Sequence, residues 1–131
     1  MSRVQLALNV SDLDRAVAFY SRLFGAEPAK RRPGYANFAV EDPPLKLVLI
    51  EGEAEGGTLN HLGVEVADTA AVAQAAGRLS SEGLATSEEQ GVECCYAVQD
   101  KVWVSDPDGA PWEVYAVLAD SPVLVKAQGC C

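Results

Sequence analysis

Hydrophobic residues occupy every second position at the start of the chain, over residues 4–10. A period of two is typical of a β-strand with one strongly apolar face, and it places Gln5 on the other face. Over residues 13–24 the apolar positions recur every three or four residues, after an N-cap signal at Ser11-Asp12 and before Gly25. This spacing predicts an amphipathic helix of about four turns. The chain therefore begins with a strand followed by a helix.

Two apolar segments, residues 35–40 and 45–50, come next, and Glu41-Asp42-Pro43-Pro44 separates them. Acidic residues followed by proline are typical of a turn, so two further strands are expected. The stretch before them leaves room for one more short strand near residues 26–30. The first half of the chain thus predicts the order β-α-β-β, with one additional short strand.

The same pattern returns after a glycine-rich segment at residues 51–57. Residues 60–68 can be laid on residues 4–12 without a gap, about 56 residues later, and the helix that follows stops at Gly83. Strands near 102–104 and 112–117 end the second copy, joined by the turn at Ser105-Asp106-Pro107-Asp108-Gly109. We therefore expect an α+β fold in one domain, with two tandem βαβββ modules forming a curved sheet. Module 1 covers about 1–52, module 2 about 58–119, and a C-terminal tail 120–131.

Composition narrows the classes of partner. The 131 residues are 49% hydrophobic and carry a net charge of −9, which makes nucleic acid or an anionic membrane an improbable partner. A small neutral or soft cationic ligand fits better. The start of the chain has no signal-peptide pattern, and no run of eighteen apolar residues occurs. We expect a cytoplasmic protein whose four cysteines are reduced thiols.

The repeat aligns Gln5 with His61, and Glu113 lies on the last predicted strand of module 2. If these faces turn inward, the three side chains converge, and their nitrogen and oxygen donors suit a borderline or hard divalent ion with open coordination positions. Taken singly, a lone histidine or a strand glutamate is more often structural than a ligand. Because His61 is the only histidine, a site of several imidazoles is excluded.

Two adjacent cysteines, Cys94 and Cys95, stand in a polar segment at residues 86–101. Adjacent cysteines rarely form a disulfide with each other, because the small ring strains the bond. The pair either binds a thiophilic atom or consists of two half-buried small residues. Gly91 and its polar neighbours indicate a mobile loop that closes on a ligand. Cys130 and Cys131 end the chain and are expected in a disordered tail.

The whole pattern resembles the vicinal oxygen chelate superfamily, which includes glyoxalase I, extradiol dioxygenases and fosfomycin-resistance proteins. The resemblance rests on the two modules, Gln5 and His61 on equivalent strands, and residues 106–113, which look like the family's closing turn and ligand glutamate. Within the superfamily, Asn60-His61-Leu62-Gly63, the Cys94-Cys95 pair and the terminal cysteines look like organoarsenical carbon–arsenic lyases and the related cadmium-induced proteins.

This resemblance implies a site with two parts. Fe(II) would be bound by Gln5, His61 and Glu113, which are also the catalytic residues. Trivalent arsenic would be bound by Cys94 and Cys95. Tyr96 and Lys101 would be secondary substrate contacts, for the organic substituent and for negative charge respectively. Lys46 lies at or near the position where glyoxalase I has a fourth ligand, and a protonated lysine cannot coordinate a metal.

We therefore predict an Fe(II)-dependent, dioxygenase-type lyase. It would cleave the carbon–arsenic bond of trivalent organoarsenicals, such as methylarsonite and trivalent aromatic arsenicals, and release arsenite. Dioxygen is the second substrate, and the protein is expected to be a monomer or homodimer. Two alternatives stay open: an extradiol-dioxygenase or glyoxalase-like enzyme, and a non-enzymatic cadmium- or metalloid-binding protein.

Overall fold

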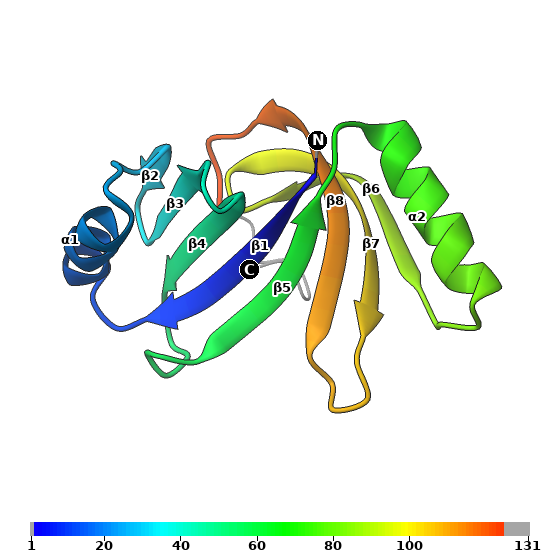
Figure 1. The fold of residues 1–131 in the computed structure, drawn as a ribbon, viewed down its shortest axis with the longest axis horizontal. Helices are drawn as coiled ribbons and strands as arrows, with labels where there is room; N and C mark the ends of the chain where they lie inside the picture. Colours follow the sequence, from blue (N-terminus) through cyan, green and yellow to red (C-terminus); the bar gives the residue numbers. More distant parts are fainter. Residues whose placement is uncertain (1, 125–131) are drawn as a thin grey trace. The chain divides into compact units, whose positions relative to one another are not determined.

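The computed structural model describes residues 2–124 of the chain, and Cys130 and Cys131 lie outside the described residues. The chain divides into an N-terminal unit, residues 3–61, and a C-terminal unit, residues 62 onward. Each unit has its own hydrophobic core. Figure 1 shows the elements of both units, coloured along the sequence.

The N-terminal unit carries one helix and a mixed sheet. Its elements are β1 (Arg3–Val10), α1 (Leu13–Phe24), β2 (Lys30–Arg32), β3 (Tyr35–Val40) and β4 (Leu45–Glu51). The strands lie in the order β2-β3-β4-β1, with β1 parallel to β4 and the other neighbours antiparallel. Apolar residues of α1 pack against β3 and β4. The short strand predicted near residues 26–30 lies at Lys30–Arg32, so the two ranges share only Lys30.

Local sequence explains where α1 starts and stops. The Asp12 side chain accepts a hydrogen bond from the Arg15 N–H at 3.1 Å, which satisfies one of the donors that the first turn leaves free. Glu51 accepts another from the Leu13 N–H at 2.7 Å. Gly25 ends the helix with φ +63°, a conformation that residues with a side chain adopt at a cost. The predicted helix is confirmed at both ends.

The C-terminal unit repeats the same order of elements. They are β5 (Leu59–Glu65), which begins in the preceding unit, α2 (Thr69–Ser81), β6 (Ser87–Cys94), β7 (Ala97–Ser105) and β8 (Pro111–Asp120). The strands lie in the order β5-β8-β7-β6, with β5 parallel to β8. Val72 and Leu79 of α2 pack on Val102 and Ala116. The two βαβββ modules expected from the repeat are therefore confirmed.

The polar segment at residues 86–101 differs from the expectation. It forms an antiparallel hairpin of β6 and β7, where we expected a mobile loop. A bulge interrupts the ladder between Glu89 and Val92, and the Gly91 N–H within it donates to the Asp100 carboxylate at 2.8 Å. Because β6 lies at the edge of the sheet, only one of its faces needs apolar residues. Its polar sequence therefore resembles that of a loop, although its backbone is hydrogen-bonded to β7.

None of the helices in the described part of the chain has the length and apolar character needed to cross a membrane.

Candidate functional site

Gln5 and His61 lie side by side in the N-terminal unit. Gln5 Nε2 and His61 Nε2 are 3.1 Å apart, and both side chains are buried. Metal–nitrogen and metal–oxygen bonds are about 2.0–2.2 Å long, so two ligands at right angles hold their donor atoms about 3 Å apart. Rotating the Gln5 amide by half a turn brings its oxygen to the same place. The pair thus fits two neighbouring metal ligands.

A chain of hydrogen bonds fixes the imidazole of His61. Its Nδ1 lies 2.7 Å from Asn60 Oδ1, so Nδ1 donates its proton there and Nε2 keeps a lone pair. Asn60 donates to Asn9 Oδ1 at 2.9 Å, and Asn9 donates to Thr58 Oγ1 at 3.0 Å. Metal-binding histidines are usually oriented in this way through their second nitrogen. The sequence reasoning missed Asn9, although the repeat places it on the same strand as Gln5.

Lys46 stands beside Gln5 in the sheet. The two residues are register partners in the parallel pair of β1 and β4, and partners of this kind point to the same face. The strand position next to Gln5 therefore carries a cationic side chain. This is the position at which the resemblance to glyoxalase I suggested a fourth metal ligand. A lysine there provides no lone pair while it is protonated.

Glu113 lies in the C-terminal unit and contacts Lys101. One carboxylate oxygen of Glu113 is 2.8 Å from Lys101 Nζ, and the two side chains are 3% and 1% exposed. The ammonium also lies over the rings of Trp103 and Tyr115, 5.3 and 6.0 Å from their centroids. A buried ammonium needs such a partner, because leaving either charge alone in the interior is costly. Lys101 is thus buried, 1% exposed, in the C-terminal unit.

Lys101 also reaches the cysteine pair. Its Nζ donates to Cys94 Sγ at 3.4 Å. One buried cation therefore contacts both a candidate arsenic ligand and a candidate metal ligand within the same unit. Sequence reasoning did not find this link, but the turn at residues 106–110 contains the signal. Pairing of Ser105 with Pro111 sets Trp103 opposite Glu113, and Lys101 then lies diagonally across on the same face.

A tight turn brings the sulfurs of Cys94 and Cys95 together. Cys94 ends β6 and pairs with Ala97, the first residue of β7. The two residues between them, Cys95 and Tyr96, have φ angles of +52° and +60°, as a two-residue type I′ turn requires. Successive side chains of a strand point to opposite faces, whereas here the two Sγ atoms lie 3.8 Å apart. The turn makes the pair a candidate chelating site.

The redox state of the pair differs from the expectation. Both cysteines are disulfide-bonded in this structure, and none among the described residues is free. The expectation of reduced thiols rested on the cellular compartment.

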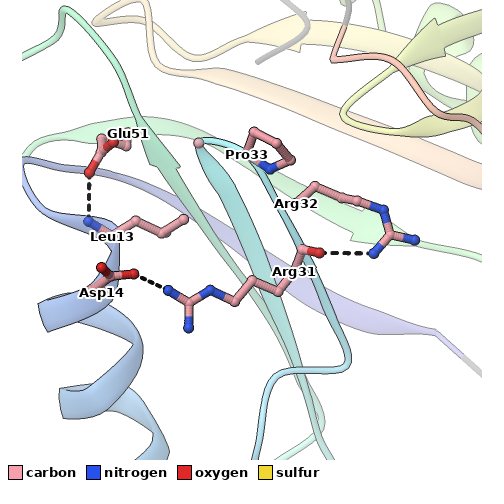
Figure 2. Close-up of a pocket in the computed structure, with 7 residues that line it drawn as sticks. Leu13, Asp14, Arg31, Arg32, Pro33 and Glu51 are labelled. Atoms are coloured by element: carbon pink, nitrogen blue, oxygen red, sulfur yellow. Dashed lines mark hydrogen bonds and ion pairs between the residues drawn. The ribbon is translucent and has the colours of Figure 1, made fainter.

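Two further features of the described residues do not involve the predicted site. No group of three or more His, Cys, Asp or Glu side chains gathers as a metal site in the described part of the chain; the predicted triad contains only two such residues. A cavity of about 460 Å³ opens beside the start of α1, and none of the predicted site residues lines it (Figure 2). Its lining consists of Leu13, Asp14, Arg31, Arg32, Pro33, Gly34 and Glu51.

Comparison with known proteins identifies the family. A family model described as the Glyoxalase/Bleomycin resistance protein/Dioxygenase superfamily matches residues 3–114. A trivalent organoarsenical cleaving enzyme from Thermomonospora curvata is 63% identical over 134 residues, covering 100% of this chain and 89% of that protein. The cadmium-induced protein CadI from Mycobacterium tuberculosis strain H37Rv is 66% identical over 121 residues, covering 92% of this chain and 80% of that protein.

Solved structures agree on the fold. The 2,3-dioxygenase LapB from Pseudomonas sp. KL28 superposes with a TM-score of 0.67 at 21% identity, covering 95% of this chain and 44% of that one. At this level of identity the likeness concerns the fold alone. Together with the family match and the repeated βαβββ order, it establishes that the chain belongs to the glyoxalase/bleomycin resistance protein/dioxygenase superfamily and has the vicinal oxygen chelate fold.

Proposed function

We propose that this protein is an Fe(II)-dependent lyase that uses dioxygen to cleave the carbon–arsenic bond of trivalent organoarsenicals and releases arsenite. Methylarsonite and trivalent aromatic arsenicals are the expected substrates. The observation that carries the proposal is the turn that holds the Cys94 and Cys95 sulfurs 3.8 Å apart. A relative that is 63% identical over the whole chain and is named for trivalent organoarsenical cleavage supports it.

The reduced cysteine pair would bind the arsenic. Two thiols replace two hydroxyl groups of the trivalent arsenical, forming two As–S bonds and releasing two water molecules. Binding through both sulfurs fixes the direction of the remaining carbon–arsenic bond, so this step positions the substrate for the reaction. Because disulfide-bonded sulfur cannot bind arsenic in this way, the state that the structure describes must first be reduced.

Gln5, His61 and Glu113 would bind the iron. The donor set of the first two fits this role, since their side-chain nitrogens are 3.1 Å apart and the hydrogen bond to Asn60 directs the lone pair of His61 Nε2 towards Gln5. Iron bound by these three residues would supply the activation of dioxygen that the cleavage requires. A neutral amide is a weaker ligand than imidazole, so the iron is expected to dissociate readily.

Lys101 would serve both parts of the site. Its ammonium lies 3.4 Å from Cys94 Sγ, so a positive charge stands next to one of the two proposed arsenic ligands. The same ammonium orients the Glu113 carboxylate through the 2.8 Å ion pair. Tyr96, the second residue of the turn, remains the proposed contact for the organic substituent.

The test uses protein that has been reduced and loaded with Fe(II) under anaerobic conditions. After methylarsonite and air are added, arsenite is measured by chromatography with elemental detection. We expect arsenite from the wild type, but none from metal-free protein. Cys95→Ser should lose arsenical binding and retain iron, whereas His61→Ala should lose iron and retain arsenical binding. Full activity of Cys95→Ser would overturn the proposal.

A non-enzymatic role in metal or metalloid binding is the second candidate. The 66% identical relative named as a cadmium-induced protein favours it. The same experiment separates the two candidates: stoichiometric arsenical binding without arsenite release would support sequestration and reject the lyase.

A further inference from the structure

Ser121 follows β8 and contacts both flanks of the cysteine pair. Its Oγ donates to the carboxylate of Glu93, the residue before Cys94. Its backbone N–H donates to the carbonyl of Tyr96, the residue after Cys95, at 2.9 Å. Ser121 is 3% exposed, so water has little access to replace these hydrogen bonds. One buried residue therefore holds the chain on either side of the two cysteines.

The same segment binds the Tyr96 backbone a second time. The Tyr96 N–H donates to the Val123 carbonyl at 3.2 Å, and the Val123 N–H donates to Ser121 Oγ at 3.3 Å. Both backbone groups of Tyr96 are thus paired with residues 121–123, which we call the strap. Because Ser121 Oγ also receives the Val123 N–H, its hydroxyl orders the strap as well as Glu93.

The turn needs external support. Cys95 and Tyr96 have left-handed backbone conformations, which residues with side chains adopt only when the surroundings hold them there. The Gln99 side chain donates to the carbonyl of Cys94, the residue just before the turn, at 2.8 Å. If the turn relaxed towards an extended conformation, the two cysteine side chains would separate to opposite faces.

We propose that Ser121 is a positioning residue for arsenical binding. By holding Glu93 and Tyr96, it keeps the turn left-handed and keeps both sulfurs on one side as a chelating pair. This inference rests on the proposed function, because it assigns Ser121 a role in that same site. Ser121 itself does not contact the substrate; it acts through the conformation of Cys94 and Cys95.

The first measurement is the affinity of reduced, anaerobic protein for the trivalent phenyl arsenical, phenylarsine oxide. Ser121→Ala should weaken binding about tenfold, as expected from losing a hydrogen bond to a charged group, and should raise KM more than it lowers kcat. Ser121→Thr keeps the hydroxyl and should restore most of the affinity. Ser105→Ala, at the exposed end of β7, is the matched control and should bind like the wild type. Iron affinity should not change in any of them.

The second measurement does not involve arsenic. Hydrogen exchange of the Tyr96 amide should become on the order of tenfold faster in Ser121→Ala, because the strap no longer protects it. An unchanged exchange rate, or wild-type arsenical affinity in Ser121→Ala, would overturn the inference. The inference would also be overturned if Ser121→Ala lost affinity for both iron and the arsenical and Ser121→Thr did not restore it. Ser121 would then have a purely structural role. Wild-type protein that fails to bind the arsenical would instead reject the proposed function.

Discussion

Replacing Lys101 by methionine tests the buried ion pair. The side chains of Lys101 and Glu113 are 1% and 3% exposed and their charged atoms are 2.8 Å apart, so water cannot take the place of the lost ammonium. Removing one partner of such a pair typically costs about 3–5 kcal/mol, because the other charge stays buried and uncompensated. Methionine keeps most of the volume and the contact with Trp103 and Tyr115. The loss is therefore mainly electrostatic.

Thermal denaturation of reduced, metal-free protein measures this loss. In a chain of this size each kcal/mol shifts Tm by about 3–4 °C, so Lys101→Met should melt about 10–20 °C below the wild type. The double variant Lys101→Met/Glu113→Gln should recover most of the difference, since no charge then remains buried. Lys30→Met, at the sheet edge in β2, is the control and should stay close to the wild type.

The result that would refute this reasoning is a Lys101→Met protein that melts within about 3 °C of the wild type. Added Fe(II) provides a further check, because a cation bound by Glu113 replaces the missing ammonium. Iron should therefore raise the Tm of Lys101→Met by more than it raises that of the wild type. An equal rise in Tm for both proteins would show that Glu113 does not bind the iron.

Three other predictions concern single parts of the site. Asn60→Ala should weaken Fe(II) binding about 10–100-fold by freeing the His61 ring, as measured by anaerobic calorimetry; unchanged affinity would show that the hydrogen bond does not orient a ligand. Cys95→Gly should lose arsenical binding without lowering the Tm of reduced protein, because glycine adopts positive φ readily. A large drop in Tm would contradict the account of the turn. Removing iron with a chelator should stop arsenite release while arsenical binding, followed by calorimetry, persists; loss of binding as well would mean that the two parts of the site are not separate.

Much of the fold followed from local sequence signals. The period-two pattern, the Asp12 cap and Gly25 placed β1 and α1, and the gap-free repeat then predicted the second module. The extent of β6 and β7 was missed, because β6 is a polar edge strand interrupted at Gly91 and its residues lack the apolar alternation of an inner strand. Hydrogen bonding in the backbone stabilises this hairpin, and a sequence pattern does not report it.

The candidate site was predictable in part. Gln5 and His61 come together because the repeat places them on equivalent strands. The interior position of Lys101 was not expected, since a lysine is rarely buried without a partner, and its partner Glu113 is identified only once the register of β7 and β8 is known. The turn at Cys95 and Tyr96 was also missed, because neither residue is typical of a position with positive φ.

X-ray absorption spectra at the arsenic and iron edges of one sample test the central claim most directly. The sample is reduced protein loaded with Fe(II) and a trivalent phenyl arsenical under anaerobic conditions. The account predicts arsenic with two sulfur ligands and one carbon, and iron with only nitrogen and oxygen ligands. Sulfur bound to iron, or arsenic with fewer than two sulfurs, would contradict the assignment of Cys94 and Cys95 to the substrate and of Gln5, His61 and Glu113 to the metal.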